Sequence, residues 1–567
     1  MTMSKKIITE REIKEAAETL RKYKAGKANL ENRIVEEEMF WKRRHWEVLR
    51  KKDEKTKPSS GWMFNSIVNK HADAMDSYPE VICLPREESD EESAKTLTSV
   101  IPVILEQNGF KDVYSDNWWY KLKHGFCAYG VFWDNNMQNG LGDVQVKKID
   151  PLNIFWEPGI RDIQKSRNLF ICDLVAVDVL KEEYPKAQIS GGEQTEIKQY
   201  IYDDNINTSD KALVVDWYYK KNGQLHYCKF CEDNILYSSE NEGLKSWYDD
   251  GEYPIEFDVL YPEEGTPIGF GIISVTKDAQ LYIDTLDEKI MNYIHAAANP
   301  RYFAKRSAGI NQKDFLDTSK AIVEVEGDID EARVKQIVLQ PLNGYVMNYR
   351  SAKVDELKET SSNRDFSQGG TAGGVTSGAA IAVLQESGSK TSRDSIDTSY
   401  RTHKRLSYKI IERMRQFYTE KRTFRITGEN GKNEFVPFDN EKIKEQSMGV
   451  TGDTELFRKP IFDIDVKAQK QNPYSTLSQN ETAMNLYNAG FFDPQAAQMS
   501  LAALKLMTFE GKKEIEDYVR QGATLQNQLM QMQGQMQALM QENAMLRGGT
   551  IPSMGMAGDH AGSPLQV

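Results

Sequence analysis

Apolar residues recur at alternating spacings of four and three between positions 279 and 297, a pattern that predicts one long helix there. The positions are Ala279, Ile283, Leu286, Ile290, Tyr293 and Ala297. This is the heptad spacing of helices that pack side by side, so one stripe of the helix needs a partner helix. The helix should end at Asn299-Pro300, because proline cannot continue it. The partner is either a helix of the same chain or one of a second copy.

The segments after this helix follow a definite order. They are a small α/β insert at 300–343, a helix centred on 354–357, a Gly/Ser/Thr/Gln loop at 367–374, and a very long helical region from 377 to about 422. This order places both ends of the insert at one pole of a helical hairpin and the loop at the other. Glycine and serine make that loop the most flexible interior segment of the chain.

The first 265 residues predict a mixture of helices and strands. Thr9 and Glu12 have the spacing of a capping box at the start of a helix. Strands are expected at 128–133 and around 144–146, and Asn222-Gly223 marks a tight hairpin. At about 150 residues per domain, a chain of 567 residues suggests three to four units. The expected fold class is therefore α+β, mostly helical.

A second heptad pattern lies near the C-terminus. Its positions are Leu525, Leu529, Met532, Met536, Leu539, Asn543 and Leu546. At 1.5 Å per residue this helix spans roughly 33 Å, and its glutamine-rich, narrow stripe favours self-association over packing within one subunit. Residues 548–567 are rich in glycine and proline and are expected to be disordered.

Charge and composition exclude several classes of protein. The chain has 72 basic and 85 acidic residues, a net charge of −13, which argues against coating nucleic acid through bulk positive charge. No apolar stretch is long enough to span a membrane, and the charged N-terminus does not read as a signal peptide. Five scattered cysteines fit folding in a reducing, intracellular place.

The common catalytic and metal-binding patterns are missing or incomplete. The segment 369–378 has the glycines of a phosphate-binding loop without its lysine, and 388–391 has the lysine without the upstream glycine. His226, Cys228 and Cys231 would supply three zinc ligands on one strand, with no second pair nearby in the sequence. The alternating pattern of 461–466 places its two aspartates on the solvent face of a strand rather than in a metal site. We expect no catalytic residue, no metal and no cofactor.

Several ordered segments resemble the portal (head–tail connector) proteins of tailed bacteriophages. They are residues 62–65 (WMFN), 130–134 (GVFWD), 142–144 (GDV), 149–158 (IDPLNIFWEP), 374–381 (GVTSGAAI) and 465–468 (DVKA). The resemblance covers roughly residues 60–480 and depends on the whole ordered set, since none of these motifs is diagnostic alone.

The resemblance implies an architecture of wing, stem, clip and crown. Mapped onto this chain, the parts are the wing at 1–265 and 377–490, stem helices at 266–298 and 345–365, a clip at 299–344, a channel loop at 366–376, a helical crown at 491–547 and a disordered tail at 548–567. It also implies a homo-oligomeric ring of twelve subunits at one capsid vertex of the virion. Double-stranded DNA would pass through the ring during packaging and ejection.

The implied partners are further copies of this chain, the DNA, the terminase motor, the head–tail adaptor, and the major capsid and scaffold proteins. The ring would be assembled in the host cytoplasm, with no membrane partner and no enzymatic activity. Two other classes stay open at this point. One is another virion or scaffold-associated oligomeric protein, and the other is an enzyme of the packaging machinery.

The resemblance also implies site residues. Those of the loop facing the channel are Asn363, Arg364, Ser367, Gln368, Gly369, Gly370, Thr371, Gly373, Gly374 and Thr376. Arg364, the cation of this loop, would brush the DNA backbone or would simply be a solvated charge. The acidic residues Asp284, Asp287 and Glu288 of the first stem helix would face the channel and repel DNA. The two heptad stripes would serve as contacts between subunits, because a ring closes through repeated head-to-tail contacts.

Overall fold

The computed structural model describes most of the chain. The described residues are 7–49, 57–191, 197–200, 210–299, 302–304, 311, 313, 334–337, 339–362, 390–427, 433–451, 454–468, 484, 486–488, 490–491, 497–506 and 512–546. Contacts divide the chain into two units, Met1–Gln469 and Lys470–Val567. None of the described helices is long and apolar enough to cross a membrane.

The first unit begins with helices that pack around a common core. They are α1 (Glu10–Trp41), α2 (His45–Leu49), α3 (Trp62–Met75), α4 (Glu91–Gln107) and α5 (Phe110–His124). The start of α1 was predicted correctly, since the Thr9 backbone N–H donates to Glu12 Oε2 at 2.9 Å. Gly125, with φ +87°, ends α5 in the left-handed region, where glycine is favoured.

Two antiparallel sheets follow α5. The three-stranded sheet has the order β3 (Asp143–Ile149), β2 (Phe126–Asp134), β9 (Ile255–Val259). The five-stranded sheet runs β4 (Ile154–Trp156), β5 (Asn168–Ala176), β6 (Lys211–Lys221), β7 (Gln224–Cys231), β8 (Asn234–Ser238). The predicted hairpin turn joins β6 to β7, with Asn222 at φ 53° and Gly223 at φ 77°. Two short helices, α6 (Met137–Gly140) and α7 (Val177–Glu183), lie in connections of this region.

The remaining strands of the first unit form antiparallel pairs. These are β10 (Tyr261–Pro262) with β11 (Gly269–Phe270), β12 (Tyr302–Ala304) with β13 (Val334–Gln336), β14 (Arg422–Thr427) with β15 (Asn433–Phe438), β16 (Gln446–Thr451) with β17 (Thr454–Arg458), and β1 (Pro79–Pro85) with β18 (Phe462–Ala468). The alternating pattern of 461–466 predicted β18, whereas β15, β16 and β17 were not predicted. The β1–β18 pair joins segments nearly four hundred residues apart, so the late strands belong to the same folded body as the first helices.

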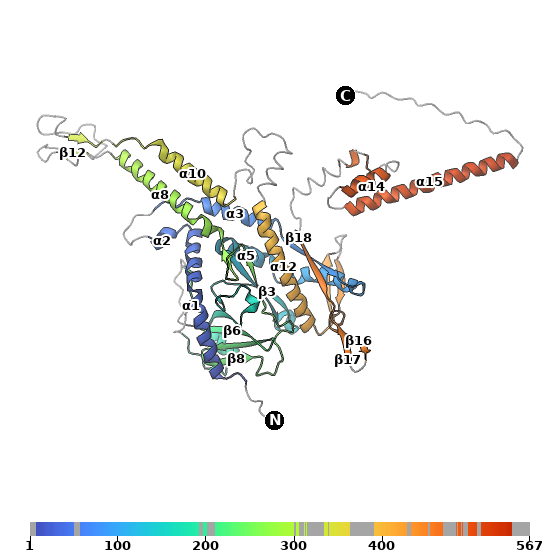
Figure 1. Cartoon of the computed structure of the whole chain (residues 1–567), viewed down its shortest axis with the longest axis horizontal. Coiled ribbons are helices and arrows are strands. Elements are labelled where there is room, and N and C mark those ends of the chain that lie inside the picture. Colours follow the sequence, from blue (N-terminus) through green and yellow to red (C-terminus); the bar gives the residue numbers. More distant parts are fainter. Residues whose placement is uncertain are drawn as a thin grey trace, which may run out of the picture. The chain divides into compact units, whose positions relative to one another are not determined.

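Three long helices complete the first unit: α8 (Ile272–Ala298), α10 (Gly344–Thr360) and α12 (Lys390–Phe417). The helix predicted from 377 to about 422 is thus described from Lys390 to Phe417, and its first part lies outside the described residues. In Figure 1, α8 and α10 run side by side towards β12, while α12 crosses the body. The expected mixture of helices and strands is confirmed.

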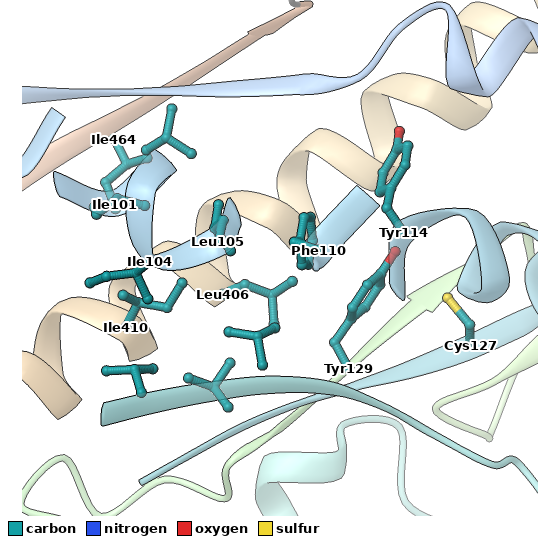
Figure 2. Packing of buried hydrophobic residues seen from close by; sticks show 14 of the residues in the cluster. Ile101, Ile104, Leu105, Phe110, Tyr114, Cys127, Tyr129, Leu406, Ile410 and Ile464 are labelled. Atoms are coloured by element: carbon teal, nitrogen blue, oxygen red, sulfur yellow. The ribbon is translucent and has the colours of Figure 1, made fainter. Parts of the chain in front are cut away.

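The largest apolar core lies where α4, α5, β2, β18 and α12 meet. Figure 2 shows Leu105, Phe110 and Leu406 among its side chains, together with Ile410 and Tyr129. All five are buried, and they come from segments about three hundred residues apart in the sequence. Burial of this apolar surface holds α12 against the early helices and the three-stranded sheet.

The second unit contains α14 (Ala497–Leu506) and α15 (Lys512–Leu546). Leu486, Leu504 and Val519 form a small buried cluster that packs the start of α15 against α14.

Candidate functional site

Helices α8 and α10 form an antiparallel hairpin whose two helices are held together along their length. Ile283 of α8 packs against Val354 and Leu357 of α10 in a small buried cluster. Further along, the Arg350 guanidinium donates to Asp287 Oδ2 at 3.0 Å. Near the far end, the Tyr293 hydroxyl donates to the Gln340 carbonyl at 2.7 Å. The predicted helical hairpin is therefore present, and the chain between its two helices carries the β12–β13 pair (Figure 1).

The first heptad stripe is used partly within the chain. Ala279 and Ile283 pack in the cluster that α8 forms with α10 and Trp62. Leu286 and Ile290 are half-buried in the single chain. Of the two partners that the spacing allowed, a helix of the same chain is the one that Ile283 contacts.

One of the three acidic residues expected to face a channel does not do so. Asp284 has no exposed surface. Its Oδ1 accepts hydrogen bonds from the Ser60 backbone N–H and hydroxyl, both at 2.8 Å, and its Oδ2 lies 3.2 Å from His45 Nε2. The prediction for Asp284 was wrong because α8 is covered on two sides, by α10 and by the segment before α3.

The other two acidic residues keep some exposure. Asp287 is half-buried and neutralised by Arg350 of α10. Hydrogen bonding to Asp287 raises the pKa of the Arg350 guanidinium, so the guanidinium stays charged. Glu288 is half-buried as well. Its orientation towards a channel stays a prediction.

The predicted channel loop lies outside the described residues. Helix α10 ends at Thr360, and the description resumes at Lys390 with α12. All ten loop residues named from the sequence, from Asn363 to Thr376, fall in this interval, so their role also stays a prediction.

The second heptad stripe is exposed in the single chain. Its members on α15 are all more than half exposed: Leu529, Met532, Met536, Leu539 and Leu546. The side chain of Leu525 lies outside the described residues. Exposed leucine and methionine at heptad positions along one helix form the kind of surface that a partner helix covers.

A ladder of buried charges, which the sequence did not single out, fixes α12 on the body. Lys121 of α5, which has no exposed surface, donates to Asp258 Oδ1 at 2.8 Å and to the Ser399 hydroxyl of α12 at 2.7 Å. Further along α12, the Lys409 ammonium lies 3.2 Å from the Glu256 carboxylate, and one turn later the Arg413 guanidinium lies 3.0 Å from the Asp250 carboxylate. The acidic partners therefore all come from one segment, 250–258, that crosses α12.

Arg413 is as deeply buried as Lys121. Its side chain is completely buried, and its guanidinium carbon lies 3.3 Å from the ring centroid of Tyr248. Stacking and the ion pair with Asp250 offset part of the cost of burying this charge. The signal in the sequence was the four-residue spacing of Arg405, Lys409 and Arg413, but only the fold identifies the acidic segment that they face.

The residues considered for zinc binding lie on one buried strand. Burial raises the pKa of the Cys228 thiol to about 12 and that of the Cys231 thiol to about 11, so both stay protonated at neutral pH. Metal-binding cysteines are thiolates. Within the described ranges, no cluster of three or more histidine, cysteine or acidic side chains could hold a metal ion. Asp463, considered for a metal site, instead accepts hydrogen bonds from Arg86.

The described residues thus form a body of helices and antiparallel strands that carries a helical hairpin, and a second unit with a long helix. A model of the phage P22-like portal protein family matches residues 72–224 and 220–550. Since this match covers most of the chain, the protein belongs to the P22-like portal family, and it is a phage portal that forms the channel for DNA packaging. The family consists of structural proteins of the capsid vertex rather than enzymes. No curated protein matches the sequence.

Proposed function

We propose that the chain forms a closed ring of twelve copies, with the parts of a portal distributed as the sequence implied. The wing comprises 1–265 and 377–490, the stem 266–298 and 345–365, the clip 299–344, the channel loop 366–376 and the crown 491–547. The observation that carries this assignment is the α8–α10 hairpin, which has the β12–β13 pair between its helices and is joined to the body at the other end.

Firm attachment of the hairpin to the body supports its assignment as the stem. At the root of α8, Asp284 is held by Ser60 and faces His45. Gln280, one turn earlier, donates to the Ser60 carbonyl at 3.1 Å. A stem must transmit force between clip and wing, and a root of buried hydrogen bonds suits that task.

The loop at 363–376 would line the channel. Its glycine, serine, threonine and glutamine residues can touch phosphates without binding them tightly, and the acidic net charge of each subunit keeps the whole channel from retaining DNA. Arg364 would brush the DNA backbone. Glu288, and not Asp284, is the stem carboxylate that we assign to the channel wall.

The ring would bind the terminase motor during packaging and the head–tail adaptor afterwards, both through the clip. The wing would contact the major capsid and scaffold proteins, and assembly would take place in the host cytoplasm. The chain would act without catalysis and without a cofactor.

The first test is to image the purified full chain by negative-stain electron microscopy and to measure its mass. Rings with a central hole and a mass near twelve times 64.8 kDa are expected. Recombinant rings of thirteen would support the same proposal.

A truncated chain separates this proposal from an unrelated coiled-coil oligomer. Deleting 521–567 should leave the ring intact, because wing and stem contacts remain. A discrete dimer or trimer that disappears on this deletion would contradict the portal assembly proposed here.

A further inference from the structure

The two sides of the α8–α10 hairpin differ in chemistry. On one side, which we call the tyrosine flank, lie Tyr282 of α8 and Tyr345 and Tyr349 of α10. Tyr345 and Tyr349 stack at 6.2 Å between ring centroids. The Lys353 ammonium lies 5.8 Å from the Tyr282 ring and 5.7 Å from the Tyr349 ring, which places the two helices' tyrosines on the same side. All three rings are exposed in the single chain, Tyr345 by 70%.

The opposite side, the methionine flank, carries Met291 of α8 and Met347 of α10. Met291 is one turn beyond Asp287, and Met347 is three residues before Arg350, so both lie next to the ion pair that joins the helices. Successive residues of a helix are rotated by 100° about its axis, so Met347 and Tyr349 lie on opposite sides of Arg350 when α10 is viewed down its axis. The same geometry separates Met291 from Tyr282 on α8. Both methionines are about half exposed.

The two flanks also lie at the same level of the hairpin. Because the helices are antiparallel and residue 287 pairs with residue 350, position 291 lies beside position 346. Met291 and Met347 are therefore level with Tyr345 and Tyr349. A rotation axis along the hairpin brings equal levels of neighbouring copies together, so each flank of one copy would meet the other flank of the next.

We propose that the tyrosine flank of one copy binds the methionine flank of the next, which makes the hairpin a head-to-tail contact between subunits. This inference depends on the ring proposed above and names the surfaces by which its stem closes. A second copy is the occupant that fits, because one chain carries both complementary surfaces. Methionine sulfur packs well against aromatic rings, and large exposed aromatic groups are typical of protein interfaces.

This contact differs from the one predicted from the heptad pattern. The stripe that includes Ile283 faces α10 of the same chain. The contact between copies uses the residues on either side of that stripe. In this proposal, the heptad spacing forms the hairpin and the tyrosines and methionines join the hairpins.

Crosslinking of the full-length chain tests the inference directly. The double variant Tyr349→Cys with Met291→Cys, treated with a short bis-maleimide, should give a ladder of covalent oligomers on a denaturing gel. The five natural cysteines are all buried, so they should not react under native conditions. Each single variant should give no ladder. The matched control pair, Asp355→Cys with Met291→Cys, places one thiol on an exposed position of α10 that points away from α8 and should also give none.

The possible outcomes separate this inference from the proposed ring. Rings with a ladder from the double variant alone support both. Rings without a ladder, or covalent dimers from Tyr349→Cys alone, overturn the flank contact and leave the ring standing. Absence of rings in the parent chain overturns the ring itself and this contact with it.

A second measurement does not require two thiols to lie within reach of a crosslinker. Tyr345→Ser with Tyr349→Ser should lower the association constant between subunits by about tenfold or more, measured as the mass distribution on dilution. The control is Asp355→Ser with Glu359→Ser, two exposed residues of the same helix, which should leave the distribution unchanged. Equal dissociation of the tyrosine variant and the control would also overturn the contact.

Discussion

Helices α12 and α15 are both long and amphipathic, but they differ in what covers their apolar faces. Helix α12 presents apolar side chains and cations to its own chain. Its Lys409 and Arg413 meet Glu256 and Asp250, and its Ser399 contacts the buried pair of Lys121, from α5, and Asp258. Helix α15 presents leucine and methionine that are more than half exposed in the single chain. An ion pair in a fold specifies one position and one register, whereas a methionine stripe accepts several packings. The first helix is therefore part of a folded body, and we propose that the second is completed by contact with other copies.

The first prediction concerns α15. Met532→Lys with Met536→Lys should destroy the packing of this helix in the ring, because two charges would be buried in the contact between copies. Each methionine contributes about 2 kcal/mol when buried, so amide hydrogen exchange over 525–546 should speed up by more than about tenfold. Exchange of the body should stay the same.

Gln531→Lys with Gln535→Lys adds the same charges one position away and is the matched control. It should keep the protection of α15. Equal loss of protection in both variants would mean that the heptad stripe is not the surface that assembly covers.

The complementary change removes a buried charge from the anchor of α12. Lys121→Met leaves Asp258 buried without its cation, which should destabilise the body by about 3–5 kcal/mol. Urea unfolding followed by circular dichroism measures this loss. Arg401→Ala removes an exposed cation on α12 that donates to the Thr398 hydroxyl of its own helix turn, and it should change stability by less than about 0.5 kcal/mol.

A double variant tells whether the cost comes from the unpaired carboxylate. Lys121→Met with Asp258→Leu removes both charges and should recover much of the lost stability, since paired buried charges can be replaced by apolar groups at little cost. If the double variant is less stable than Lys121→Met, the ion pairs themselves stabilise the body. Their role would then not be to specify the position and register of α12.

A third prediction concerns pH and the joint between α1, α5 and α8. Burial opposes ionisation of Glu38, but hydrogen bonds and charges from His124 and Lys123 outweigh this effect. They lower the pKa of Glu38 from 4.5 to about 2. A carboxylate with a lowered pKa in the folded state stabilises the fold above about pH 4.5. That stabilisation is lost as the pH falls from about 4.5 towards 2.

Glu38→Gln should therefore flatten the fall in stability between pH 4.5 and pH 2, while lowering stability at pH 7 by on the order of 2–3 kcal/mol. Urea midpoints at several pH values measure both effects. Glu36→Gln, on an exposed position of the same helix turn whose contact with Lys277 is 3.4 Å, is the control. A Glu38→Gln profile parallel to that of the parent protein would contradict the assignment.

Local signals in the sequence predicted the secondary structure well. The Thr9–Glu12 cap, the Asn222-Gly223 turn and the heptad helix at 279–297 all depend on residues within a few positions of one another, and the structure contains each of them. The helical hairpin with its insert also followed from the order of segments. Each of these features depends on residues close together in the chain, so a single sequence is enough to predict them.

Contacts between distant segments could not be predicted. Asp284 looked like a surface charge because its partners, Ser60 and His45, lie more than two hundred positions away. Lys121 and Ser399 are 278 positions apart, and neither stands out in its own neighbourhood. The tyrosine flank was missed for the same reason, since Tyr282 joins Tyr349 only after the hairpin has formed. The role of such a charged or aromatic residue depends on neighbours from distant segments, which are known only from the folded structure.

The smallest effect is expected for an ion pair of the same kind of charges at the surface. Arg86 at the end of β1 donates to Asp463 of β18 at 2.7 and 3.0 Å, a better geometry than several pairs of the α12 ladder. Both side chains are about half exposed, so water and salt screen the attraction. Arg86→Ala should lower stability much less than Lys121→Met does, and 0.5 M salt should erase most of that small cost in urea unfolding. Since Arg86 and Lys121 each pair with one aspartate at similar distance, burial is the main difference between them. A loss for Arg86→Ala as large as that for Lys121→Met would show that burial does not decide which charges hold this body together.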